Sequence, residues 1–184
     1  MSEERIRLFV ALELPDTVRE KLRDWRDHAL QGADGVRPIP AEAMHATLCF
    51  LGWRSADQID AIRDACGVLV AQPVPELALG HATWLPPRRP RVLAVEIQDG
   101  AGALARVQAT LAGVLEAGGW YQPEKRPYLA HITVARVGRG AKVSCEIPAV
   151  PLLTFSAPRI TLYRSRLFRA GARYEPLGTV ELAA

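Results

Sequence analysis

The sequence predicts a protein of mixed strands and helices, built around two related strand motifs. Stretches with the period of a strand alternate along the chain with amphipathic helical stretches. Residues 45–52 read HATLCFLG and residues 131–138 read HITVARVG, so His, Thr, an aliphatic residue and Gly recur at the same offsets. The 184 residues suit a single domain, for which roughly 150 residues is typical. We therefore expect one unit, 1–184, with two similar lobes that carry the motifs at 45–48 and 131–134.

The hydrophobic pattern predicts the individual elements. Alternating apolar residues indicate strands, and apolar residues three or four apart indicate helices. Polar residues before a helix are placed as N-caps, and prolines or glycines end elements. The expected order is a strand over 5–14, a helix capped by Asp16 and reaching about residue 30, a loop over 32–40, the first motif strand over 44–51, a helix capped by Ser55 and reaching 69, strands over 77–85 and 92–97, a helix over 104–115, the second motif strand over 128–137, and two or three further strands.

The two motifs predict a common site. Side chains alternate between the faces of a strand, so the His and Thr of each copy point to the same side. In the first copy this rule places His45, Thr47, Cys49 and Leu51 on one face. Two copies related by a pseudo-twofold axis then face each other with two imidazoles and two hydroxyls. Arg136 falls on the opposite face of a regular strand, and it needs a bulge or a strand end to reach the site.

These side chains suit attack on a phosphodiester. One imidazole takes a proton from the nucleophile while the other gives one to the leaving oxygen, and a pKa of ~6.5 keeps both forms populated near neutral pH. Thr47 and Thr133 are placed to donate hydrogen bonds to the non-bridging oxygens. The sequence has neither the Cys/His spacing of a zinc site nor the carboxylates of a magnesium site, and no GxSxG. We expect no metal, no cofactor and no Ser or Cys nucleophile.

A third His-x-Thr, at His81, shows how little one copy means. The residues that follow Thr83, Trp84-Leu85-Pro86-Pro87, break the strand instead of continuing to a glycine. We therefore expect His81 to pack or to lie at the rim of the site.

Composition sets further limits. The net charge of +3 and the pI of about 9.0 favour a polyanionic partner only mildly. The chain has no apolar run of the roughly 20 residues that a membrane helix needs, and its start lacks a signal-peptide layout. We expect a cytoplasmic protein. The cysteines, Cys49, Cys66 and Cys145, form no CxxC pair and are expected to be reduced structural thiols.

The chain resembles the 2H phosphoesterase superfamily, and within it the RNA 2′,3′-cyclic phosphodiesterases, also called 2′-5′ RNA ligases. The resemblance covers nearly the whole chain. It implies a bilobal α+β fold in which two antiparallel sheets with outer helices flank an active-site cleft. Its sequence basis is RLFVALELP at 7–15, MHATLCFLG at 44–52, RRPRVLAVEI at 88–97, AHITVARV at 130–137, ITLYRSRL at 160–167 and the later Tyr174, with Ala130 where many relatives have proline.

The resemblance also implies the roles of the site residues. His45 and His131 correspond to the acid–base pair of the family. Our own hypothesis for the pair is His45 as proton donor and His131 as proton acceptor. The positions of Thr47, Thr133 and Arg136 bind phosphate there. The residues by themselves leave open which histidine is the acid and which the base.

The expected reaction is hydrolysis of 2′,3′-cyclic phosphate ends of RNA to 2′-phosphate ends, and the same pair is able to run 2′-5′ ligation in reverse. RNA ends or nucleotides are the expected partners of a monomeric protein. Arg88, Arg89 and Arg91, on a rigid proline-rich loop over 86–91, are either RNA-backbone contacts or solvated surface charge. Two alternative functions stay open: a non-catalytic module that grips RNA ends or nucleotides, and an enzyme for another small cyclic phosphate.

Overall fold

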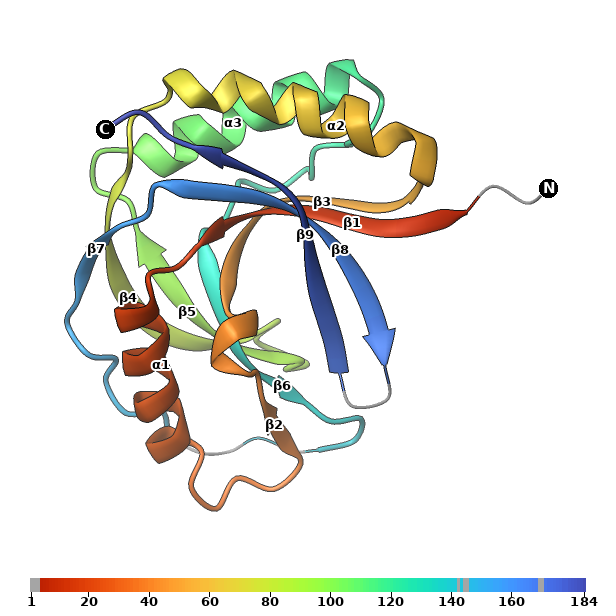
Figure 1. Cartoon of the computed structure of the whole chain (residues 1–184). Coiled ribbons are helices and arrows are strands. Elements are labelled where there is room, and N and C mark those ends of the chain that lie inside the picture. Colours follow the sequence, from red (N-terminus) through yellow and green to blue (C-terminus); the bar gives the residue numbers. More distant parts are fainter. Residues whose placement is uncertain (1–3, 142, 144–145, 169–170) are drawn as a thin grey trace.

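The strands of the protein form one curled, antiparallel sheet with helices packed against it (Figure 1). The structure is a computed structural model that describes residues 4–141, 143, 146–168 and 171–184. The order across the sheet is β7-β4-β5-β6-β3-β1-β8-β9, and β2 pairs with β6. The α+β class is thus confirmed. The strands are β1 (Arg5–Glu13), β2 (Val36–Pro38), β3 (His45–Ser55), β4 (Glu76–Leu85), β5 (Val92–Gln98), β6 (His131–Val137), β7 (Thr154–Ser156), β8 (Arg159–Phe168) and β9 (Gly171–Glu181).

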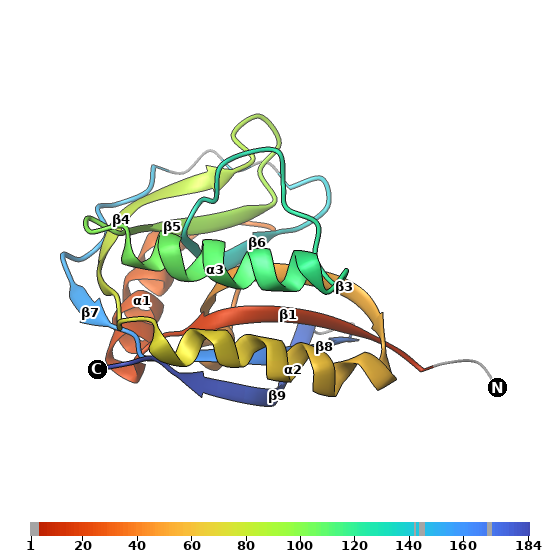
Figure 2. The same cartoon turned by 90° about the horizontal axis from the view of Figure 1, so that it is seen from above.

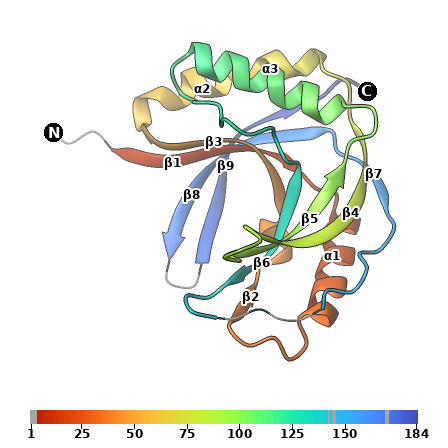
Figure 3. The ribbon, with the colours of Figure 1, turned by 180° about the vertical axis from the view of Figure 1, so that it is seen from behind.

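The two motif strands are neighbours at the centre of the sheet. β3 and β6 run antiparallel and are joined by the pair Ala46–Ile132. β1, β8 and β9 extend the sheet beyond β3, and β5, β4 and β7 extend it beyond β6, as the view from behind shows (Figure 3). The two expected sheets are therefore the two halves of one continuous sheet, and the short β3–β6 junction brings both motifs together.

The helix that precedes each motif in the sequence packs against the half of the sheet that holds the other motif. α1 (Asp16–Ala29) comes before the first motif in the sequence, yet it packs near β6. α3 (Ala103–Ala117) comes before the second motif, yet it packs against β3. α2 (Ile59–Cys66) lies beside α3 on the same side of the sheet (Figure 2). Each half of the sheet is thus covered by a helix from the other part of the sequence.

Some expected element boundaries are wrong. The N-cap of α1 is Pro15, whose carbonyl accepts the first helical N–H groups, and Asp16 is already helical. Ser55 precedes a short 3-10 helix, Ala56–Gln58, and makes no capping hydrogen bond through its side chain. The expected loop over 32–40 contains β2, because the backbone of 36–38 pairs with the edge of β6.

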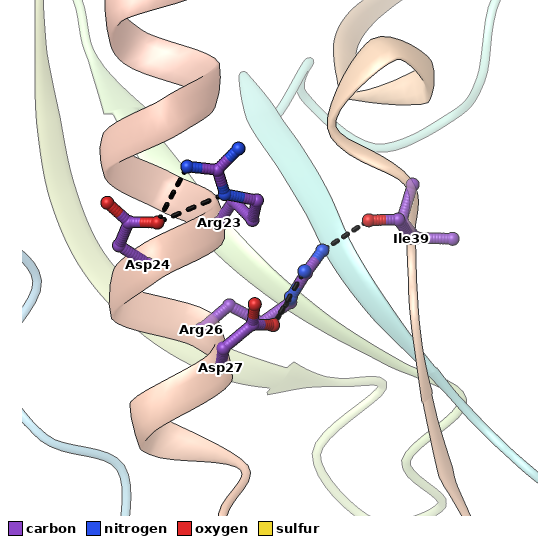
Figure 4. A network of polar contacts seen from close by, with 5 residues as sticks. All are labelled: Arg23, Asp24, Arg26, Asp27 and Ile39. Atoms are coloured by element: carbon purple, nitrogen blue, oxygen red, sulfur yellow. Dashed lines mark hydrogen bonds and ion pairs between the residues drawn. The ribbon is translucent and has the colours of Figure 1, made fainter.

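A buried arginine ties α1 to the segment that enters the first motif (Figure 4). Arg26 donates to the carbonyl of Ile39 and, at 2.6 and 2.9 Å, to a carboxylate oxygen of Asp27. The N–H of Ile39 in turn donates to the carbonyl of Val134 on β6, at 2.9 Å. The segment before His45 is thus fixed between α1 and the second motif strand.

None of the helices in the described ranges is both long and apolar enough to cross a membrane. Cys49 and Cys66 are free, buried thiols, as expected. Burial raises the pKa of Cys49 to about 12 and that of Cys66 to about 11, so both stay protonated near neutral pH. Cys145 lies outside the described residues.

Candidate active site

Each motif strand carries a β-bulge directly after its His-x-Thr. The extra residue is Leu48 on β3 and Val134 on β6. The first six residues of the two strands consequently share one burial pattern, with two successive buried residues at the bulge. A bulge reverses the alternation of side chains beyond it. The fifth residue after each histidine, Phe50 or Arg136, therefore points to the same face as the His and Thr.

The bulges test two expectations about which side chains share a face of the strand with the histidine. Arg136 needed a bulge to reach the site, and the bulge is present. The expectation that Cys49 and Leu51 share a face with His45 is wrong: both are buried, whereas Phe50 is 48% exposed. A regular alternation cannot anticipate an inserted residue.

Four of the five motif-based site residues line one pocket of about 120 Å³. The fifth, His131, is not among its lining residues, although the β3–β6 register places it across from Thr47 on the same face. A charge on His131 also lowers the pKa of His45, so the two imidazoles are close enough to interact. The pocket is lined by Arg7, Phe9, Ile39, Ala43, His45, Thr47, Phe50, Thr133, Arg136, Ser165 and Tyr174.

The ring of His45 is held by backbone and aromatic contacts. Its Nδ1 donates to the carbonyl of Ala43 at 2.8 Å, and its Nε2 lies 3.2 Å from the hydroxyl of Thr47. The ring stacks on Phe9 at 4.9 Å and meets the edge of Tyr174 at 5.1 Å. Burial among these groups lowers the pKa of His45 from 6.5 to about 4, and the charge of Arg136 adds to this shift. In the free protein His45 is neutral, with its proton on Nδ1.

His131 has the same backbone contact but a more open setting. Its Nδ1 donates to the carbonyl of Leu129 at 2.8 Å, again two residues before the histidine. In both copies this leaves Nε2 as the nitrogen available for proton transfer. Glu96, on β5, is the direct cross-strand partner of His131.

His81 does not line the pocket. Its side chain is 73% exposed, so it does not pack in the core. Its Nδ1 donates to a carboxylate oxygen of Glu96 at 2.6 Å.

The site also contains residues that the motifs did not predict. Arg7 donates to the hydroxyl of Ser165 at 3.2 Å, and its guanidinium lies 4.6 Å from the ring centre of Phe50. The apolar alternation of the first strand puts Arg7 and Phe9 on the face away from the core, which is a signal the sequence does contain. Ser165 lies on β8, which pairs with β1, and Tyr174 lies on β9, which pairs with β8, so both reach the site through strands far from the motifs in the sequence.

The loop arginines stand apart from the pocket. Arg88, Arg89 and Arg91 are exposed between β4 and β5, and none lines the pocket. The carbonyl of Arg91 accepts the N–H of Val137 at 2.8 Å, so the loop adjoins the end of the second motif strand. Within the described part of the chain, no three His, Cys, Asp or Glu side chains are grouped to hold a metal ion.

A curled antiparallel sheet with two central His-x-Thr strands defines a two-histidine phosphoesterase. The family described as LigT-like phosphoesterase matches residues 12–94. An RNA 2′,3′-cyclic phosphodiesterase of Escherichia coli is 33% identical over 179 residues, which cover 96% of each chain. One of Archaeoglobus fulgidus is 30% identical over 134 residues, 73% of this chain and 74% of the relative. The protein therefore belongs to the LigT-like phosphoesterase family.

Solved structures agree with this assignment. A crystal structure of a phosphoesterase superposes with a TM-score of 0.85 at 31% identity, and covers 98% of this chain and 100% of the other. The E. coli LigT structure in its apo form gives a TM-score of 0.84 at 29% identity and covers 100% of both chains. E. coli LigT complexed with 3′-AMP gives 0.79 at 28% identity and covers 98% of this chain and 100% of the other.

Proposed function

We propose that the protein hydrolyses 2′,3′-cyclic phosphate ends of RNA to 2′-phosphate ends without a metal. The carrying observation is the duplicated site: two histidines, each fixed through Nδ1 by the carbonyl two residues earlier, on adjacent strands and on one face. The E. coli and A. fulgidus relatives bear the name of this activity, and E. coli LigT has been solved with 3′-AMP. The two catalytic histidines belong to one bilobal unit of residues 1–184.

The proposed step is an in-line displacement at phosphorus. His131 takes a proton from water, whose oxygen bonds to the phosphorus of the cyclic ester. The bond from phosphorus to O3′ breaks, and His45 gives a proton to O3′ through Nε2. Thr47, Thr133 and Arg136 hold the non-bridging oxygens, where negative charge builds up in the transition state. When the 5′-hydroxyl of a second RNA takes the place of water, the same displacement forms a 2′-5′ linkage: His131 takes the proton of that hydroxyl, and His45 again gives a proton to O3′.

The order of the two histidine roles has its own test. His45 must carry a proton on Nε2 to act as donor, and its pKa of about 4 in the free protein works against this. The negative charge of a bound phosphate raises that pKa and favours the proposed order. In a cyclic substrate whose bridging 3′ oxygen is replaced by sulfur, the thiolate leaves without a proton. His45→Ala then keeps far more activity than His131→Ala; the opposite result assigns the base to His45.

The size of the pocket supports a phosphate as the bound group, but it does not identify the molecule that carries the phosphate. At about 120 Å³ it is smaller than the roughly 300–1,000 Å³ of a site for a whole drug-sized ligand. It accommodates the phosphate while the nucleoside lies outside. We propose RNA ends and nucleotides as partners of a monomeric, cytoplasmic enzyme, with Arg88, Arg89 and Arg91 contacting the RNA backbone. Another small cyclic phosphate is the second candidate substrate.

The experiment is product analysis of a 2′,3′-cyclic mononucleotide by phosphorus NMR, with and without EDTA. We expect only the 2′-phosphate, at the same rate in both samples, because an imidazolium replaces the Lewis acid of metal phosphodiesterases. Binding without turnover would support the non-catalytic module. Loss of turnover in EDTA that a divalent ion restores would overturn the metal-free mechanism.

A further inference from the structure

A row of aromatic and arginine side chains continues from the pocket along the same face of the sheet. A second bulge on β3, at Leu51, turns Trp53 to this face, where its cross-strand partner is Arg7. Phe50 and Arg7 line the pocket, whereas Trp53 lies beyond it and is 52% exposed. We call Phe50, Arg7 and Trp53 the outer strip.

The outer strip has the chemistry of a single-stranded nucleic-acid site. The guanidinium of Arg7 lies 4.6 Å from the ring centre of Phe50, and Arg5 donates to the carbonyl of Trp53 at 3.1 Å. Alternating aromatic rings and arginines bind RNA by stacking bases and by attracting the backbone. Residues of β1, β3, β8 and β9 surround the strip on the same face of the sheet. Among those that the structure describes, none between Arg5 and the pocket carries a carboxylate.

We propose that the outer strip binds the RNA on the 5′ side of the cyclic phosphate, with the base of an upstream nucleotide stacked on Trp53. This inference rests on the proposed function, because the strip overlaps the phosphate pocket at Phe50 and Arg7 and extends beyond it to Trp53. Because of the bulge at Leu51, Phe50 and Trp53 face Phe9 and Arg7, which are two residues apart on β1, so they lie about 7 Å apart along the sheet. That span exceeds the ~3.4 Å rise of stacked bases. The bases are therefore splayed apart, each on its own ring.

The choice of RNA over another occupant follows from charge and continuity. Arg5 and Arg7 flank Trp53 on β1, and the strip shares two of its three residues with the phosphate pocket. A protein partner or a second copy of the chain would be an alternative cover for Trp53. The experiment distinguishes these occupants.

The test compares kcat and KM for cyclic-phosphate-ended substrates from one to five nucleotides long. In the wild type we expect kcat/KM to rise at the length that reaches Trp53. Trp53→Ala should remove this rise, with KM for the pentanucleotide increased about tenfold and the mononucleotide unaffected, since stacking on one ring contributes about that factor. Trp53→Phe should retain most of the rise. Direct binding of a pentanucleotide that ends in a 2′-phosphate should weaken in parallel.

Phe168→Ala is the matched control. Phe168 is also 52% exposed and has an arginine, Arg173, 5.2 Å from its ring centre, but it points to the opposite face from Ser165. We expect it to behave as wild type on every length. If wild type fails to turn over the mononucleotide, the proposed function is wrong. If wild type is active but Trp53→Ala matches it on the pentanucleotide, or changes only the oligomeric state, the outer strip does not bind RNA.

Discussion

The two motif strands share a backbone pattern but differ in nearly every side chain around it. In β3 and β6 the histidine is fixed by the carbonyl two residues before it, the threonine follows at two residues, and a bulge comes next. The fifth residue after the histidine is an aromatic, Phe50, in one copy and a cation, Arg136, in the other. The repeated part orients the chemistry, and the varied part assigns a different task to each strand.

The glycines that recur seven residues after each histidine also differ between the two copies, in the reason why a glycine is needed. Gly52 has a φ of +72°, a conformation that side chains rarely adopt. Gly138 has no positive φ, but a Cβ there would lie 3.0 Å from the carbonyl oxygen of Gly35. One glycine meets a conformational need and the other a close backbone approach. Equal sequence positions therefore do not imply equal physical causes.

The largest expected effect tests the shared part of the comparison. His45→Ala and His131→Ala should each lower kcat/KM on a cyclic mononucleotide by ~10²–10⁴-fold, because each removes a proton-transfer group. Circular dichroism should show both variants folded. His81→Ala, with its exposed contact to Glu96, should change the rate only a few-fold. An equally damaging His81 variant would mean that the catalytic pair is misassigned.

The next largest effect tests the position, five residues after each histidine, at which the two motifs differ. Arg136→Ala should lower kcat by ~10²-fold, since it removes a charge that stabilises the transition state. Phe50→Ala at the equivalent position should act mainly on KM, because an aromatic ring offers no such charge. Steady-state kinetics on the mononucleotide separates the two. A larger kcat loss in Phe50→Ala than in Arg136→Ala would break the division between the copies.

A third prediction concerns the burial of His45. Because kcat/KM reports ionisations of the free enzyme, its acid limb should fall near pH 4 instead of 6.5. The folded protein favours neutral His45, so its contribution to stability is present above pH 6.5 and is lost as the pH falls towards 4. The difference in unfolding free energy between wild type and His45→Gln should thus shift by ~3 kcal/mol from pH 7 to 4. A pH-independent difference would show that His45 titrates normally.

A smaller effect is expected from removing the hydrogen bond between Arg26 and Ile39, which fixes the segment before the first motif. The described contacts of the second motif include no such bond. Arg26→Ala should lower the free energy of unfolding by ~1.5–3 kcal/mol, because it removes the buried, charged donor of the part-buried carbonyl of Ile39. Arg23→Ala is the control: Arg23 pairs with Asp24 in the same way but on the exposed face (Figure 4). Urea denaturation should show no measurable change for Arg23→Ala.

The smallest effect is expected at the loop beside the second motif. Replacing Arg88, Arg89 and Arg91 by Ala together should raise KM for a cyclic-phosphate-ended oligonucleotide a few-fold at low salt and flatten its salt dependence. The mononucleotide reaction should be unchanged, because none of the three lines the pocket. Kinetics at two salt concentrations measures this. Loss of mononucleotide turnover would place the loop inside the site.

Sequence by itself determined the local features of this protein. The α+β class, most element positions, the two His-x-Thr motifs and the core face of β1 follow from spacings of two to four residues, which strand and helix geometry convert directly into faces. The resemblance to a known family rests on the same local segments.

Only the tertiary structure decided how these elements combine. The bulges at Leu48 and Val134 depend on pairing with β1 and β5, and they alone bring Phe50 and Arg136 to the site. The exchanged helices, the arrival of Tyr174 and the low pKa of His45 likewise arise from contacts between residues far apart in the chain. A local pattern specifies which way a side chain points, but burial and register are properties of the packed neighbours, so they appear only when the sheet has formed.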